Sequence, residues 1–150
     1  MERNKNLWIY NAGSSFSGNP KWMFLYMMKK HPDVKGVWLT YDFATTKYIR
    51  GLGYEAYLFK SPAGKSYMKK AGVYVVNQVK EIIQPELLGI TMLNLWHGVG
   101  CKTVEQKVNF GFLRERIIKK YIQNNKFYKQ SQLFLVTSEL MEEHFIKQCG

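Results

Sequence analysis

Short apolar runs alternate with longer amphipathic segments along this chain, and that alternation constrains the fold more than any other feature. Each apolar run has the length of a buried strand, and most of the segments between them have the length of a helix. The six predicted strands are Leu7–Tyr10, Gly36–Thr40, Glu55–Phe59, Val73–Val76, Ile90–Trp96 and Leu133–Val136. Strands that alternate with helices predict an α/β fold with a mostly parallel sheet and flanking helices.

The segments between the strands predict helices over 20–30, 44–50, 62–71 and 111–129, and a last helix after Thr137-Ser138. Ser61 is expected to cap the third helix, with Pro62 at its first position and Gly72 just past its end. A length of 150 residues fits one domain, over residues 1–150. Parallel sheets bind ligands at the carboxyl ends of their strands, so the loops after the first, fifth and sixth strands are candidate sites.

The chain is strongly basic: 22 lysines and arginines face 11 acidic residues, a net charge of +11. Such an excess predicts an anionic partner, which is a nucleic acid, a phosphate-rich substrate or an acidic membrane surface. No recognised nucleic-acid-binding module accompanies the charge, so we expect no nucleic acid partner. Two cysteines and three scattered histidines form no metal-type spacing, and neither a metal nor a cofactor is expected.

No signal peptide is recognised, and no run reaches the roughly 18 to 20 apolar residues that span a bilayer. The expected location is therefore the cytoplasm, with the protein peripheral on the inner face of the cell membrane.

The first candidate site is the glycine- and serine-rich loop over 13–19, between the first strand and the first helix. Free N–H groups at the start of that helix would bind an anion, and Lys21 would add a positive charge for a phosphate. The alternative is an ordinary strand-to-helix connection with Asn19 as the helix cap. The loop alone does not decide between them.

The second candidate site follows the fifth strand, which delivers Trp96 and His97 to its carboxyl end and then breaks at Gly98. A histidine there can titrate near neutral pH and act as a base, and a glycine lets the backbone approach a ligand closely. The alternative is a histidine that serves packing at the end of a strand.

The stretch from Lys102 to Lys129 is basic and carries apolar residues at helical spacing, among them Leu113 and Ile117. A basic amphipathic helix can lie on an anionic bilayer, and its predicted membrane contacts are Arg114, Arg116, Lys119 and Lys120. The alternative is a surface helix whose apolar stripe packs on the sheet.

The segment Leu93–Lys102, with its apolar strand followed by Trp-His-Gly and a lysine, resembles the CDP-glycerol glycerophosphotransferases, the teichoic-acid primases and polymerases. Phe16–Lys21 is similar to the Gly-Asn-x-Lys loop of that family, and Ser61–Val76 to its helix running into the fourth strand. Val136–Ser138 resembles the segment before the family's second domain. After Trp-His-Gly the family often has Thr-Pro-Leu-Lys-Lys, where this chain has Val-Gly-Cys-Lys-Thr.

The resemblance implies the N-terminal, acceptor-side half of a GT-B type enzyme, built on a Rossmann-like sheet. Family members transfer glycerol phosphate from CDP-glycerol to a lipid-linked polyol-phosphate acceptor and release CMP. Their second domain, which supplies most of the CDP-glycerol site, is expected to be absent from this chain, so the chain alone is expected to be inactive. The resemblance makes His97 the base, and makes the substrate and phosphate ligands Gly18, Asn19, Lys21, Trp96, Gly98 and Lys102.

Two other functions stay open at this point. One is the N-terminal half of a different GT-B glycosyltransferase, which would use a sugar nucleotide as donor. The other is a basic membrane-associating module without catalytic activity.

Overall fold

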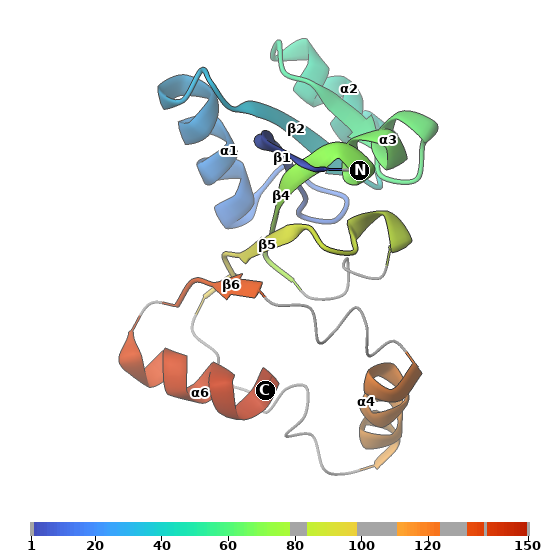
Figure 1. The fold of residues 1–150 in the computed structure, drawn as a ribbon, viewed down its shortest axis with the longest axis vertical. Helices are drawn as coiled ribbons and strands as arrows, with labels where there is room; N and C mark the ends of the chain where they lie inside the picture. The colour runs from blue at the N-terminus through green and yellow to red at the C-terminus, as the bar shows by residue number, and fades with distance from the viewer. Residues whose placement is uncertain (1, 79–83, 99–110, 124–131, 137, 150) are drawn as a thin grey trace.

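The computed structural model describes residues 2–78, 84–98, 111–123, 132–136 and 138–149. In that part of the chain a six-stranded sheet has the order β3-β2-β1-β4-β5-β6, and all its neighbouring strands are parallel (Figure 1). The predicted α/β fold is confirmed. The strands are β1 (Asn4–Tyr10), β2 (Lys35–Thr40), β3 (Ala56–Leu58), β4 (Ala71–Val76), β5 (Thr91–Asn94) and β6 (Gln132–Phe134).

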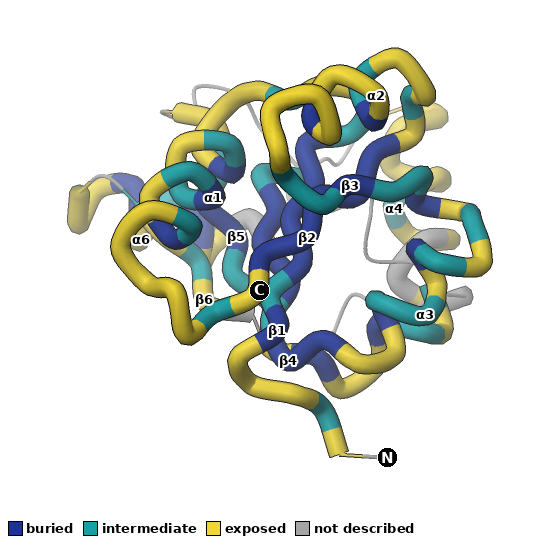
Figure 2. The backbone as a smooth tube through the Cα atoms, turned by 90° about the horizontal axis from the view of Figure 1, so that it is seen from above, coloured by how far each residue is buried: buried dark blue, intermediate teal, exposed yellow. Residues whose placement is uncertain are grey.

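Helices cover both faces of the sheet. Figure 2 shows α1 on one side of the central strands and α3 on the other. The bounds are α1 (Gly18–Lys30), α2 (Phe43–Gly51), α3 (Pro62–Lys70), the 3₁₀ turn η2 (Pro85–Leu87), α4 (Gly111–Gln123) and α6 (Glu139–Cys149). The end of the predicted 111–129 helix, past Gln123, lies outside the described residues.

Two apolar cores lie on the two faces because successive residues of a strand point to opposite sides. Ile9 of β1 joins the core with Met68 of α3, whereas the next residue, Tyr10, joins the core with Phe24 of α1 and Ile49 of α2. All five side chains are buried. The sheet is thus covered on both faces, as parallel sheets are, and its functional groups are left to the strand ends.

The start of α3 agrees with its sequence and the end does not. The Ser61 hydroxyl accepts the N–H of Gly64 at 3.1 Å, which confirms the predicted cap. Gly72 does not close the helix; it lies inside β4, and the prediction was wrong. A Cβ atom on Gly72 would stand 2.6 Å from the carbonyl oxygen of Asn4, so glycine is there because β4 passes close to β1.

The predicted fifth strand was also too long at its carboxyl end, since β5 stops at Asn94. Leu95 continues the pairing through its N–H, which donates to Val76 O at 2.8 Å. At Trp96 the backbone turns into the left-handed region with φ of +49°, which no strand residue adopts.

Arg3 ties the start of β1 to two distant segments. Its guanidinium donates to carbonyl oxygens at the end of α3 and the start of β4, and to others in and after η2, at distances of 2.7 to 3.3 Å. The acceptors belong to Met68, Lys69, Ala71, Glu86 and Leu88. This one side chain therefore holds the corner between α3 and β4 against η2.

Across the described ranges, every helix is too short or too polar to cross a bilayer.

Candidate active site

The strand order reverses between β1 and β4. From β1 the chain proceeds outward to β2 and β3, then returns past β1 to β4. Helix α1, which follows β1, packs on one face through Phe24, whereas η2, which follows β4, packs on the other face through Leu87. Ligands of open parallel sheets bind at such a reversal point. The loop after β1, the residues after β4 and the turn after β5 all end at this edge.

The loop after β1 is held in place by polar side chains. Buried Asn11 donates to Leu39 O at 2.8 Å and accepts the N–H of Gly13 at 2.9 Å. Thr40 donates through its hydroxyl to Gly13 O at 3.1 Å, and Thr45 donates to Ser14 O at 2.9 Å. The loop is therefore fixed before any ligand binds.

Helix α1 begins next to the reversal point. Its N-cap is Ser17, whose side chain makes no capping hydrogen bond, and its first turn holds no acidic residue. Gly18 has φ of +66°, and a Cβ atom there would lie 3.1 Å from Asn77 Nδ2, just past β4. A larger residue at Gly18 would be strained and crowded, so the glycine brings α1 close to the end of β4.

Asn19 is not the cap of α1, contrary to one interpretation of the sequence. Its side-chain Nδ2 donates to Leu95 O at 3.1 Å and to Trp96 O at 3.0 Å. The structure thereby joins the first candidate loop to the second, and the start of α1 lies against the turn that carries His97.

His97 is exposed at the carboxyl edge, one residue past Trp96. Its imidazole stacks on the Trp96 indole, with ring centroids 4.3 Å apart and an interplanar angle of 22°. The indole also packs on the rings of Phe134 of β6 and Phe145 of α6, with ring centroids 5.6 Å and 5.0 Å away. The imidazole is accordingly open to solvent and held by a ring that is itself packed.

Lys21 lies in the first turn of α1, half-buried. Its Nζ stands over two aromatic rings, 5.3 Å from the centroid of Phe16 and 4.9 Å from that of Trp22. These cation–π contacts orient the ammonium group at the helix start. The phosphate contact predicted for Lys21 stays a prediction.

Asp42 also lies at this edge, just past β2, but its carboxylate is occupied as the N-cap of α2. The N–H of Thr45 donates to Asp42 Oδ2 at 2.7 Å, and this bond lowers the pKa of the carboxyl from its usual value. The group is thus an ionised cap rather than a base near neutral pH.

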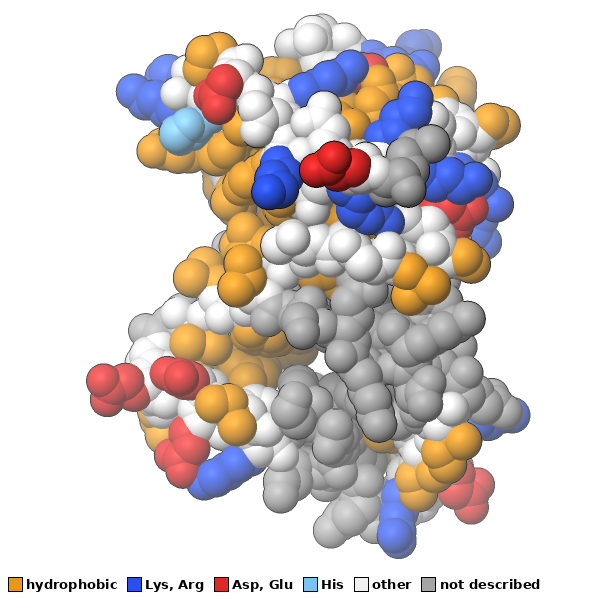
Figure 3. All heavy atoms as spheres, viewed as in Figure 1, with side chains coloured by type: hydrophobic (Ala, Val, Ile, Leu, Met, Phe, Trp, Pro, Cys, Tyr) orange, Lys and Arg blue, Asp and Glu red, His pale blue; other side chains and the backbone are white. Residues whose placement is uncertain are grey.

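The structure describes only some of the predicted lysines and arginines of the site and of the membrane-contacting helix. Lys102 lies outside the described residues, as does the side chain of Lys120. Arg114, Arg116 and Lys119 lie on α4, which stands away from the strands in Figure 1. Apolar Phe112 and Ile122 on the same helix are 67% and 70% exposed, and Figure 3 shows hydrophobic and basic groups side by side there. Leu113 of the predicted stripe is exposed too.

Sequence reasoning missed three asparagines at this edge. Asn11 follows β1, Asn77 follows β4, and Asn94 is the last residue of β5. Asn94 is fully buried, and its Oδ1 accepts the N–H of Trp96 at 3.0 Å. A polar residue at the end of an apolar strand was the available signal, repeated on three adjacent strands.

The family model of the CDP-Glycerol:Poly(glycerophosphate) glycerophosphotransferases matches residues 1–149. The chain belongs to this family. No curated protein sequence matches it.

Among solved structures, the chain is similar to the wall teichoic acid polymerase TagF. One TagF structure, of a histidine-to-alanine variant, superposes with a TM-score of 0.77 at 16% identity and covers 98% of this chain. Another, of a histidine-to-asparagine variant soaked with CDPG, gives 0.77 at 16% identity and covers 97%. The chain spans 36% and 37% of those two polymerase chains. The predicted Rossmann-like architecture, of the kind found in a GT-B type enzyme, is confirmed.

Proposed function

We propose that this glycerophosphotransferase-family chain is the acceptor-side domain of an enzyme that transfers glycerol phosphate from CDP-glycerol. The observation that carries the proposal is an exposed imidazole, His97, at the carboxyl edge of a parallel sheet and beside its reversal point. The TagF structure soaked with CDPG supports the choice of donor. The acceptor proposed is a lipid-linked polyol phosphate in teichoic acid or related cell-surface polymer synthesis.

In the proposed reaction, a ring nitrogen of His97 takes the proton from the acceptor hydroxyl. The hydroxyl oxygen forms a bond to the β-phosphorus of CDP-glycerol, and the bond from that phosphorus to the bridging oxygen breaks. CMP leaves with the electron pair. A positioned base contributes about 10²- to 10⁴-fold in rate, and positive groups around the phosphoryl oxygens supply further stabilisation. We assign that stabilisation to Lys21, Lys102 and the backbone amides at Gly18 and Gly98.

The proposal includes a second domain that holds most of the donor. The chain spans only about a third of the TagF chains it superposes on. Residues 1–150 by themselves are therefore expected to release little CMP from CDP-glycerol in the presence of a lipid-linked acceptor. Robust turnover by these residues alone would contradict the two-domain arrangement.

Membrane contact is proposed for α4, which would place the enzyme peripherally on the inner face of the membrane. Its basic residues Arg114, Arg116 and Lys119 accompany exposed apolar Phe112 and Ile122. Basic and apolar groups on one helix fit the charged headgroups and the acyl boundary of an anionic bilayer. A membrane-linked acceptor would then be delivered to the same domain that carries the base.

The test of the base is His97→Ala in a complete family enzyme that carries these 150 residues. CMP release should fall by about 10²-fold or more, with the folded state intact by circular dichroism. The matched control is His31→Ala, because His31 ends α1 at the opposite edge of the sheet and contacts Tyr26. An unchanged rate for His97→Ala would remove the catalytic role. Turnover with uridine or guanosine sugar nucleotides in place of CDP-glycerol would favour a different GT-B transferase.

A further inference from the structure

Trp96 has a backbone conformation that the fold must enforce. Among the described residues it is the one non-glycine residue with a positive φ, at +49°. Bulky side chains rarely adopt this region, and such residues persist where surrounding contacts over-determine them. We propose that Asn19 and Asn94 are positioning residues that lock the Trp96 peptide in this conformation and so hold His97 exposed at the carboxyl edge of the sheet. The inference rests on the proposed function only for the identity of His97 as the base.

The two asparagines hold Trp96 from opposite ends of the residue. Asn94 Oδ1 accepts its N–H at 3.0 Å from a fully buried position at the end of β5. Asn19 Nδ2 donates to its carbonyl oxygen at 3.0 Å and to that of Leu95 at 3.1 Å. Both of the latter partners are acceptors, so the Asn19 side chain must offer its amide NH₂ group to them.

This geometry gives Asn19 a different role from the phosphate contact that the sequence suggested. A side-chain amide has two N–H bonds, and both are used on the carbonyl groups of Leu95 and Trp96. The remaining side-chain oxygen is an acceptor, which has no attraction for a phosphate oxygen. Asn19 therefore acts through the turn after β5, and not on the substrate.

The turn decides where the two rings go. With φ of +49° at Trp96, the indole packs against Phe134 and Phe145 while the neighbouring imidazole stacks on it and stays exposed. If the peptide relaxed to an extended conformation, consecutive side chains would point to opposite faces, and the stack would be lost. The asparagine pair thus preserves the direction of the base, which a general base needs for catalysis.

The experiment compares Asn19→Asp with the unaltered 150-residue chain by NMR of the histidine rings. Aspartate has the same shape but lacks the NH₂ group, and a carboxylate in the first turn of a helix is favourable, so α1 should be retained. The ring protons of His97, assigned through His97→Gln, should be shifted upfield by the stacked indole in the unaltered chain. Asn19→Asp should abolish that shift.

The matched control is Asn6→Asp, which makes the same chemical change at an exposed residue of β1 near the amino edge. It should leave the His97 ring shift unchanged. Asn19→Ala is the second variant, which removes the donors without adding charge, and it should behave as Asn19→Asp does. A folded Asn19→Asp or Asn19→Ala chain that keeps the upfield shift would overturn the inference.

A kinetic measurement separates this inference from the proposed function. In a complete enzyme, Asn19→Asp should lower kcat by about 10²-fold and leave the KM for CDP-glycerol unchanged, because both side-chain N–H bonds of Asn19 are already used on Leu95 and Trp96. A raised KM with unchanged kcat would instead make Asn19 a ligand and contradict the positioning role. If the unaltered enzyme showed no glycerophosphotransfer, the proposed function would fail, while the NMR comparison would still decide how His97 is held.

Discussion

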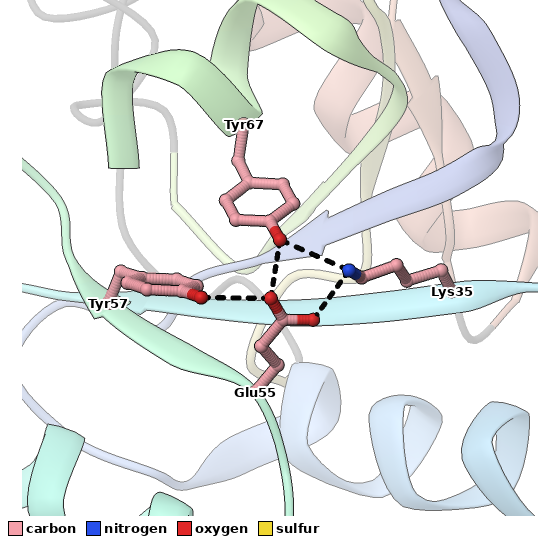
Figure 4. Close-up of polar contacts among 4 residues, drawn as sticks. All are labelled: Lys35, Glu55, Tyr57 and Tyr67. Carbon is pink, nitrogen blue, oxygen red and sulfur yellow. Dashed lines mark hydrogen bonds and ion pairs between the residues drawn. The ribbon is translucent and has the colours of Figure 1, made fainter. Parts of the chain in front are cut away.

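Glu55 is the centre of a polar cluster at the amino edge of the sheet, far from the candidate site (Figure 4). Lys35, the first residue of β2, approaches Glu55 Oε2 to 2.7 Å and donates to the Tyr67 hydroxyl at 3.1 Å. Tyr57 and Tyr67 both donate their hydroxyl groups to Glu55 Oε1. One carboxylate therefore joins β2, β3 and α3 through three hydrogen-bonding partners.

The cluster changes the acidity of its members. Burial raises the pKa of the Glu55 carboxyl, but the hydrogen bonds from Lys35, Tyr67 and Tyr57 outweigh burial and leave that pKa below its ordinary value of 4.5. The hydrogen bond to Glu55 raises the pKa of Tyr57 to about 12 and also raises the pKa of Lys35. At neutral pH these shifts favour the ionised Glu55 carboxylate, the charged Lys35 ammonium and the protonated Tyr57 hydroxyl that donates to Glu55.

Stability should therefore depend on pH through Glu55. A carboxyl whose pKa is lowered by folding stabilises the protein above its unfolded value of 4.5, and that contribution is lost as the pH falls through the folded pKa. Glu55→Gln should lower the free energy of unfolding at neutral pH by at most about 1 kcal/mol, as for part-exposed ion pairs. The difference in unfolding free energy between Glu55→Gln and the unaltered chain should shrink in urea denaturation curves recorded at successively lower pH. Glu142→Gln, at an exposed position of α6, is the control; a difference that stayed constant with pH would contradict the linkage.

At the scale of an element, α3 depends on a glycine in its first turn. A Cβ atom on Gly64 would stand 2.4 Å from the backbone oxygen of Leu58, the last residue of β3, and 2.9 Å from that of Phe59, which follows it. The helix could accept a larger residue only by moving off the sheet. Gly51, in the last turn of α2, is different, since a Cβ atom there would meet nothing within 4 Å.

Gly64→Ala is expected to destabilise the protein by about 1–3 kcal/mol, the usual range for overpacking. Gly51→Ala should be neutral or stabilising by up to about 1 kcal/mol, because alanine favours a helix over glycine. Urea denaturation of the two variants beside the unaltered chain measures both. Equal stability of the two variants would show that α3 can shift without cost.

Local signals explain which elements the sequence predicted well. The Ser61-Pro62 start of α3 and the Ser138 start of α6 depend on neighbouring residues only, and both were correct, with Ser138 Oγ 3.4 Å from the N–H of Met141. Gly72 was misassigned because the contact that requires a glycine there is with Asn4 of β1, which lies more than 60 residues away in the chain. The contact between Asn19 and Trp96 joins residues 77 positions apart, and no local pattern encodes it. The loops of the candidate site were thus predictable, but their junction was not.

At the scale of the whole molecule, the effect of the net charge of +11 depends on where the basic residues lie on the surface. Lysines and arginines are spread over the upper part of the surface seen in Figure 3, whereas α4 combines its charges with exposed apolar groups. Spread charges attract an anionic surface weakly and without orientation. On α4 the basic groups would attract the helix to an anionic bilayer, and the apolar groups would anchor the helix in it.

Replacing Arg114, Arg116 and Lys119 by glutamine should weaken binding to phosphatidylglycerol vesicles by about 10²-fold, at about 1 kcal/mol for each basic residue near the surface. The control replaces Lys29, Lys30 and Lys47 by glutamine, which lowers the net charge equally on α1 and α2. Co-sedimentation at low and high salt measures both variants. Equal weakening in the two would show that total charge, and not α4, governs the association.

The hydrogen bonds of Arg3 have a consequence for how the polypeptide is made. The acceptors of Arg3 extend as far along the chain as Leu88, which is synthesised 85 residues later. The second edge of β1 is filled only after β4 has been synthesised. A ribosome adds about 5–20 residues per second, so this interval lasts roughly 4 to 17 seconds. Until β4 is made, within that interval, at least one edge of the nascent β1 stays open, and another nascent chain can pair with it. Slower translation before Leu88 should therefore increase aggregation, and chaperones that shield emerging strands should relieve it.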